Sequence, residues 1–207
     1  MTPWSTHVLR RTALAAASVT LASSVLAGCS GDEVDAGGPA PTGETSAPTP
    51  TPTPEPVVTN ATINRVDGDL ADGGRDRLRD RVLGAVDAWI DGAYGGSYPR
   101  EDFSEAFASF TDAAAKRAVD DEDLMSNATL GDRLDAVLPV RRRLRIDVLG
   151  VDGRAVAVTA QVVLGLELSG EITRRDRIAG SLYLTYEKSG TAPGWRVFGY
   201  DISRKAV

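Results

Sequence analysis

The clearest periodic pattern in the chain is a stripe of apolar residues between Arg75 and Tyr94. Apolar side chains recur there at intervals of three and four residues, the spacing that places them on one face of an α-helix. Charged residues fill the opposite positions, and Gly95-Gly96 follows as a stop signal. The stripe consists of Leu78, Val82, Ala85, Val86, Trp89, Ile90 and Ala93. The pattern predicts one long amphipathic helix whose stripe is buried.

Two further helices are predicted after this one. The first should begin near Pro99, because proline suits the first turn of a helix, and it should bury an aromatic stripe. That stripe consists of Phe103, Phe107 and Phe110. Thr111 is a suitable N-cap for the second helix, which should run to about Val119. Residues 120–139 show no sustained period and are predicted to be irregular, with a helical turn around Leu124.

From Val140 onward the apolar period changes from 3.6 to 2, the period of a β-strand with one buried face. Successive segments with this period lie at 140–150, 156–168, 178–186 and 195–202. A short run at 59–66 predicts a leading strand. Helices followed by a run of strands are typical of an α+β domain. We therefore predict N-terminal helices packed on a curved, cone-like, four-stranded antiparallel meander.

The first hairpin of this meander can be aligned from the pattern. A two-residue Asp152-Gly153 turn would place Ile146 opposite Thr159 and would mix polar and apolar faces. A three-residue loop at 151–153 would instead place Ile146 opposite Val158. Because the second register gives one apolar face, we predict the three-residue loop, with its glycine in the left-handed conformation.

The N-terminus has the organisation of an export signal. Arg10 and Arg11 precede an uncharged stretch, Thr12 to Leu26, that is rich in Ala, Val, Leu and Ser. As a helix this stretch would rise only about 22 Å. A bilayer core is about 30 Å thick, so a permanent transmembrane helix is not expected.

The segment Leu26-Ala27-Gly28-Cys29 resembles the lipobox of bacterial lipoproteins, in which a Leu and two small residues precede an invariant Cys. The resemblance implies that Cys29 becomes the mature N-terminus and carries fatty acyl chains such as palmitate. Two chains anchor stably where one is marginal, since each buried CH₂ contributes about 0.8 kcal/mol. The alternative is an ordinary secretory signal with an incidental Cys29. Arg10-Arg11 also loosely resembles a twin-arginine signal, so the export route stays open.

A linker follows Cys29. Seven of the eleven prolines lie between Pro39 and Pro56, and residues 30–58 contain no aromatic side chain. Such a segment cannot form a hydrophobic core and favours disorder or polyproline II. The predicted organisation is a signal peptide at 1–28, a lipidated Cys with a Pro/Thr-rich disordered linker at 29–58, and one α+β domain at 59–207.

Composition excludes several kinds of chemistry. His7 is the only histidine and Cys29 the only cysteine, so a processed and acylated chain would have neither a histidine nor a free thiol. Ser-His-Asp triads, cysteine nucleophiles and zinc sites built on His or Cys are then excluded. The formal net charge is -6, so no nucleic-acid partner is expected. We predict no metal and no cofactor.

The order of elements, closed by the segment 195–201, resembles the nuclear-transport-factor-two-like cone fold, which also covers ketosteroid isomerase and SnoaL-like proteins. The layout is also similar to that of actinobacterial Mce-associated proteins, in which a membrane segment precedes such a domain. The resemblance implies a pocket between the sheet and the first helix. Its candidate residues are Trp89, Tyr186, Trp195, Tyr200 and Asp201. Alternatively, the aromatic side chains are core and Asp201 lies in solvent at the end of the sheet.

Clusters of charge provide two more candidate sites. The acids at 120–123 offer oxygens that suit calcium but lack the spacing of a calcium loop, so solvated acids or a helix cap are expected. Two arginine clusters, the second in a hairpin loop, are predicted to meet near one end of the sheet. They comprise Arg141, Arg142, Arg143, Arg174, Arg175 and Arg177. They form a candidate patch for an anionic lipid, a cell-wall polymer or an acidic partner, unless neighbouring acids neutralise them.

Together these features predict a lipid-anchored protein on the extracytoplasmic face of the cell membrane. The predicted role is a non-catalytic binding or interaction module of the envelope, with an envelope protein or an apolar ligand as partner. The alternative is a small pocket enzyme of ketosteroid isomerase or cyclase type, which would use a buried carboxylate as its base. A third reading is a structural spacer, which would have neither a pocket nor a patch.

Overall fold

The computed structural model describes residues 56–188 and 193–207. The predicted signal peptide, Cys29 and nearly all of the predicted linker lie outside the described residues. The elements are β1 (Asn60–Asp67), α1 (Gly74–Tyr94), the 3-10 turn η1 (Ser104–Phe107), α2 (Asp112–Asp120), α3 (Glu122–Met125), the 3-10 turn η2 (Gly131–Arg133), β2 (Leu134–Val151), β3 (Arg154–Gly170), β4 (Arg174–Glu187) and β5 (Gly194–Ala206). The α+β class is confirmed. None of the helices in these residues is long and apolar enough to cross a membrane.

The strands form one mixed sheet in the order β1-β2-β3-β4-β5. Strands β2 to β5 are the predicted antiparallel meander, and the predicted leading strand is present as β1. However, β1 pairs with β2 in parallel, so the four-stranded antiparallel description is wrong in strand number and in the direction of the edge pair. Apolar period locates a strand but carries no information about its partner. The long connection through α1, α2 and α3 supplies the crossover that parallel strands need.

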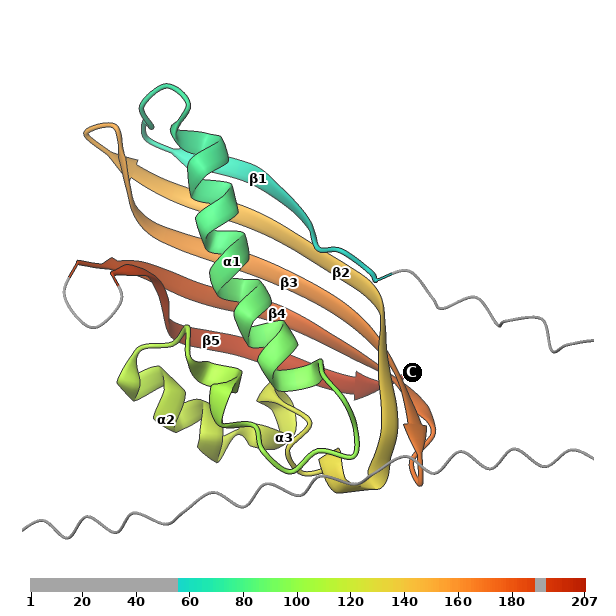
Figure 1. The fold of residues 1–207 in the computed structure, drawn as a ribbon. Helices are drawn as coiled ribbons and strands as arrows, with labels where there is room; N and C mark the ends of the chain where they lie inside the picture. Colours follow the sequence, from blue (N-terminus) through green and yellow to red (C-terminus); the bar gives the residue numbers. More distant parts are fainter. Residues whose placement is uncertain (1–55, 189–192) are drawn as a thin grey trace, which may run out of the picture. The chain divides into compact units, whose positions relative to one another are not determined.

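Helix α1 crosses one face of the curved sheet, and α2 and α3 lie on the same side near β5 (Figure 1). We refer to this side as the helix face and to the opposite side as the open face. The predicted stripe of α1 is buried, except that Ala85 is half-buried. Strand residues that point to the helix face, such as Leu144, Ile146 and Leu164, are fully buried against it. The core therefore lies between α1 and the sheet.

The predicted helix from Pro99 is wrong, although its three phenylalanines are buried as expected. Only the four-residue η1 forms in this region. The backbone of the following residues pairs with the edge of β5 instead. The Thr111 N–H donates to the Val197 carbonyl, and the Val197 N–H donates to the Ser109 carbonyl. A segment that hydrogen-bonds to a strand cannot also satisfy the hydrogen bonds of a helix, and the aromatic spacing does not reveal this competition.

The third predicted helix is confirmed as α2, with the Thr111 hydroxyl accepting a hydrogen bond from the Ala114 N–H at 3.4 Å. The predicted turn around Leu124 is α3. Residues 134–139, predicted to be irregular, belong to β2. The register of β2 shifts after Leu134 and again after Pro139, so a strict period of 2 is interrupted there. Residues 134–139 therefore lack the strict alternation of apolar and polar residues that would predict a strand.

The β2–β3 hairpin has a two-residue turn, so the predicted three-residue loop is wrong. Asp152 and Gly153 both have positive φ angles, 51° and 72°, which is the geometry of a type I′ turn. A bulge beyond the turn shifts the register, so that Ile146 lies opposite Ala160. The single apolar face is nevertheless confirmed, because the extra residue lies in β3 and not in the turn. Both registers preserve the same alternation.

Candidate functional site

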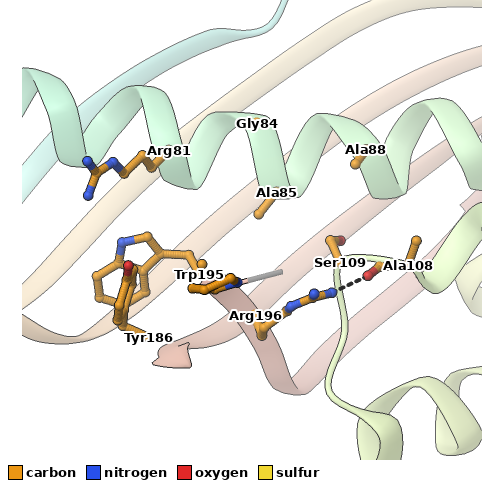
Figure 2. A pocket seen from close by; sticks show the side chains of 11 residues that line it. Arg81, Gly84, Ala85, Ala88, Ala108, Ser109, Tyr186, Trp195 and Arg196 are labelled. Carbon is orange, nitrogen blue, oxygen red and sulfur yellow. Dashed lines mark hydrogen bonds between the residues drawn. The ribbon is translucent and has the colours of Figure 1, made fainter. Parts of the chain in front are cut away.

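An open groove lies between α1 and the neighbouring ends of β4 and β5. It has two adjoining hollows of about 620 and 750 Å³ that share Arg81, Tyr186 and Trp195. Small residues of α1 form one wall, and Figure 2 shows Gly84, Ala85 and Ala88 along the helix above the two aromatic side chains. Because these helix residues are small, the aromatic wall stays accessible.

The aromatic wall is a cross-strand pair. Tyr186 on β4 lies directly opposite Trp195 on β5, and alternation places both side chains on the helix face. Their ring centroids are 5.9 Å apart and their planes meet at 71°, an edge-to-face arrangement. Trp195 is almost buried, whereas Tyr186 is 39% exposed. The pair is therefore fixed on one side and presents aromatic surface on the other.

The second hollow is rich in positive charge. Its cations are Arg77 and Arg81 of α1, Arg154 at the start of β3, and Lys188 just after β4. Within the part of the chain that the structure describes, none of the four forms an ion pair. The carboxylate among the lining residues is Asp152, in the exposed hairpin turn. This end of the groove therefore favours a negatively charged group.

Ser109 adds a polar group to the wall of the first hollow. Its hydroxyl oxygen is buried and has no hydrogen-bond partner among the described residues. Arg196, beside it, donates a hydrogen bond to the Ala108 carbonyl (Figure 2). Buried polar atoms are nearly always hydrogen-bonded, so the Ser109 hydroxyl is available to a bound molecule or to water.

The predicted pocket residues are only partly brought together. Tyr186 and Trp195 line the groove. Trp89 is fully buried in the core, where its indole N–H donates to the Met125 carbonyl at 3.0 Å. Tyr200 is also buried, and Asp201 is exposed on the open face. The five residues were predicted to share one pocket because the order of elements resembles that of the cone fold. The position of a residue along a strand does not specify which end of the sheet α1 leaves uncovered.

The side chain of Tyr200 contacts residues of α2 and of the turn that follows it, and its role is structural. Its hydroxyl donates to Asp121 Oδ2 at 2.8 Å, and the Arg117 guanidinium lies 4.7 Å from its ring centroid. Burial and then the hydrogen bond to Asp121 raise the pKa of Tyr200 well above its ordinary value. The hydroxyl therefore keeps its proton and holds α2 against β5.

Of the residues that line the groove, only Tyr186 and Trp195 were predicted, and those missed include Arg77, Arg81, Ser109, Arg154 and Lys188 together with the small residues of α1. A signal for part of this set is present in α1. Arg77, Arg81, Gly84, Ala85 and Ala88 recur at intervals of three and four residues and form a second helix face beside the buried stripe. Small residues on a partly exposed helix face indicate an uncovered surface, but the strands that lie opposite are known only from the fold.

Among the acids at 120–123, Asp121 makes side-chain contacts within the protein. Asp121 accepts the hydrogen bond from Tyr200 and lies 3.5 Å from Arg117 Nε, and Glu122 begins α3. Across residues 56–188 and 193–207, no three His, Cys, Asp or Glu side chains gather in a way that could hold a metal ion.

The predicted basic patch divides between the two faces of the sheet. Arg142 points to the helix face, where it lies 2.8 Å from both Asp87 and Asp91 of α1. Arg174 ion-pairs with the buried carboxylate of Asp176. Both residues therefore leave the predicted patch, because neighbours along a strand point to opposite faces. Exposed positions on the open face are occupied by Arg141, Arg143, Arg175 and Arg177. The second cluster lies in β4, so its placement in a loop is wrong.

Replacement of Trp89 by Phe tests its assignment to the core. The change leaves the Met125 carbonyl without its partner and opens a small cavity, so we expect a loss of about 2–4 kcal/mol in the free energy of unfolding. Urea denaturation measures this loss. Tyr186→Phe is the matched control, and its stability should lie within about 0.5 kcal/mol of the parent protein. An unchanged stability for Trp89→Phe would contradict the assignment.

Comparison of the chain with protein-family models, with curated proteins and with solved structures gave no match in any of the three searches.

Proposed function

We propose that this protein is a lipid-anchored binding module on the extracytoplasmic face of the cell membrane, with the groove beside α1 as its ligand site. The observation that carries the binding role is the combination of an aromatic wall with four cations that have no ion pair among the described residues. The anchor rests on the sequence, on the lipobox-like segment that ends at Cys29. The resemblance to the cone fold is supported by the position of α1 across a curved sheet, while the parallel edge strand β1 departs from the expected meander.

The ligand class follows from the two hollows. An apolar body fits the first hollow, between Trp195 and the small residues of α1, where it would bury apolar surface at about 25 cal/mol per Å². A negatively charged group fits the second, near Arg81 and Arg154. The proposed ligand is therefore a small amphipathic anion.

A binding role is favoured over the isomerase alternative. That chemistry needs a buried carboxylate facing the cavity, because burial is what raises its pKa into the range of a useful base. The carboxylate in the groove, Asp152, is exposed. Asp176 is buried, but it lies outside the groove and is already paired with Arg174 and Arg204. The groove thus offers recognition chemistry without a positioned base.

A fluorescent dye with the proposed ligand chemistry tests the groove. The probe is 8-anilinonaphthalene-1-sulfonate, an aromatic anion, added to the mature chain from position 29 carrying Cys29→Ser. We expect saturable binding that Gly84→Leu weakens at least tenfold. A methyl group at Gly84 would meet no atom within 4 Å, so the free protein has room for a larger side chain there, and leucine would project into the first hollow and narrow it. Leucine is also the better helix former by roughly 0.8 kcal/mol, so stability should not fall.

Two controls make the result specific. Ala113→Leu adds similar apolar volume to an exposed site on α2, away from the groove, and should leave dye binding unchanged. The neutral analogue N-phenyl-1-naphthylamine has the same aromatic body without the sulfonate, and it should bind at least tenfold more weakly. Undiminished binding to Gly84→Leu would contradict the groove as the site, and equal affinity for the neutral dye would contradict the preference for an anion.

A further inference from the structure

The open face of the sheet carries a row of cations on three of four successive strands, β2 to β5. Arg141 on β2 and Arg177 on β4 both lie opposite Gly165 on β3, and Lys205 on β5 lies opposite Arg177. Adjacent strands are about 4.8 Å apart, so the row spans roughly 15 Å. Gly165 contributes no side chain between the two arginines. All three cations are exposed, and none forms an ion pair within residues 56–188 and 193–207.

Two more arginines of β2 extend this row. Arg143 and Arg145 occupy the next open-face positions and are exposed. Arg145 donates a hydrogen bond to the neutral Asn64, so its charge is not compensated there. We name Arg141, Arg143, Arg145, Arg177 and Lys205 the basic face.

The acids on the same side do not neutralise the basic face. Glu167 forms an ion pair with Arg175 at 2.6 Å, so these two residues add no net charge. Asp147, which accepts hydrogen bonds from the neutral Asn64 and Gln161, and the exposed Asp201 each keep a negative charge, so two acids stand against the five cations. Arg65 and Asp67 of β1 pair with each other. The basic face therefore keeps an excess of positive charge.

The charge of the domain is segregated between its two layers. Residues 134–207, which hold β2 to β5, contain twelve Arg and Lys and eight Asp and Glu. Residues 59–133, which hold β1 and the helices, contain nine Arg and Lys and sixteen Asp and Glu. A helix layer is about 10–12 Å across, and the Debye length is about 10 Å at 0.1 M salt. Acids on the outer side of the helices are consequently screened from a surface that touches the open face.

The chain also enters the fold beside the basic face. Asn60, the first residue of β1, lies opposite Arg143 on β2. The segment that leads from the proposed anchor at Cys29 therefore joins the domain at the edge of the sheet, next to Arg143 of the basic face, while Thr59 just before it hydrogen-bonds to Asp87 of α1. A bilayer that holds the anchor would be the nearest large anionic surface.

We propose that the basic face docks on an anionic lipid bilayer, the surface to which the proposed Cys29 anchor attaches the chain. This inference rests on that proposed location, but not on the groove. In the docked orientation the helix face points away from the membrane, so the groove between α1 and β5 stays open to solution. The electrostatic attraction is reversible and salt-dependent, which distinguishes it from insertion of acyl chains.

Vesicle co-sedimentation tests the docking surface without the anchor. The protein is the mature chain from position 29 carrying Cys29→Ser, and the probes are vesicles of equal phosphatidylglycerol and phosphatidylcholine and vesicles of phosphatidylcholine alone. We expect binding to the anionic vesicles only, weakening as salt rises. The triple variant Arg141→Gln, Arg177→Gln, Lys205→Gln should bind about 100-fold more weakly, because each cation near an anionic bilayer contributes close to a factor of five.

A second triple variant removes the same charge from the helices and serves as the control. Arg75→Gln, Arg79→Gln and Lys116→Gln lie on α1 and α2, and this variant should bind as the parent does. Equal weakening by the two triple variants, or no binding to anionic vesicles at 20 mM salt, would overturn the proposal. Binding to a soluble anionic polymer such as heparin without binding to vesicles would also overturn it and reassign the basic face to a polymer. Dye binding in the groove is scored separately, so either proposal can fail alone.

Discussion

Replacement of Asp176 by Leu is expected to lower the free energy of unfolding by about 3–5 kcal/mol. Asp176 has no exposed side-chain surface, and Arg204, its partner on β5, is 7% exposed. The Arg204 Nε donates to Asp176 Oδ2 at 2.7 Å. Without the carboxylate, a buried guanidinium would keep only neutral partners. Total stabilities of domains are about 5–15 kcal/mol, so this is a large fraction.

Arg204 joins the sheet to the loop after α3. Its guanidinium donates to the Ser126 carbonyl and to Asn127 Oδ1, each at 2.8 Å. The Asn127 amide donates in turn to the Tyr98 hydroxyl at 3.0 Å, and that hydroxyl donates to the Tyr94 carbonyl. Burial raises the pKa of both tyrosines above the ordinary value, so both hydroxyls remain donors. The ion pair between Asp176 and Arg204 therefore supports the contacts that join β5 to the loop after α3.

A double-mutant cycle in urea tests this account. Asp176→Leu and Arg204→Met should each destabilise strongly, and the double variant should lose about 2 kcal/mol less than the sum of the two, since neither charge is then left alone. Asp76→Leu is the matched control, because Asp76 pairs with Arg79 in solvent and such pairs contribute about 0–1 kcal/mol. A loss below about 1 kcal/mol for Asp176→Leu would contradict the structural role of the pair.

Replacement of Cys29 by Ser is expected to abolish acylation completely. Cys29 is the chain's only thiol, so no second site can substitute for it. The measurement is incorporation of an alkyne-tagged palmitate by cells that produce the full chain, together with the mass of the mature protein. The parent protein should be labelled and should begin at Cys29, with the mass of a diacylglyceryl group.

Ser30→Ala is the control for this experiment, because it alters the neighbouring residue and should retain the label. An unlabelled parent protein that begins elsewhere would show that the signal is an ordinary secretory one. The groove and the basic face would then belong to a secreted protein, and the docking proposal would lose its location while the dye experiment would stand.

The sequence alone determined the elements that follow a single local rule. The stripe from Leu78 to Ala93 gave α1 within one residue of its start, because a long amphipathic period has few alternatives. Alternation located four strands and gave the correct buried face of β2, β3 and β4, where buried positions repeat every second residue, whereas in β5 the buried positions change parity between Val197 and Tyr200. Thr111 gave a helix start because a cap is satisfied locally by its own helix.

Tertiary structure decided what depends on partners distant in sequence. It placed β1 parallel to β2, drew the backbone at Ser109 and Thr111 onto Val197, and divided the arginine clusters between two faces. It also separated Trp89 from the groove and brought Arg81 of α1 to Trp195 of β5. Apolar period specifies which side of an element is buried, whereas a binding surface consists of what the packed elements leave uncovered. The uncovered surface depends on where α1 crosses the sheet, and no local pattern in the chain specifies the crossing point.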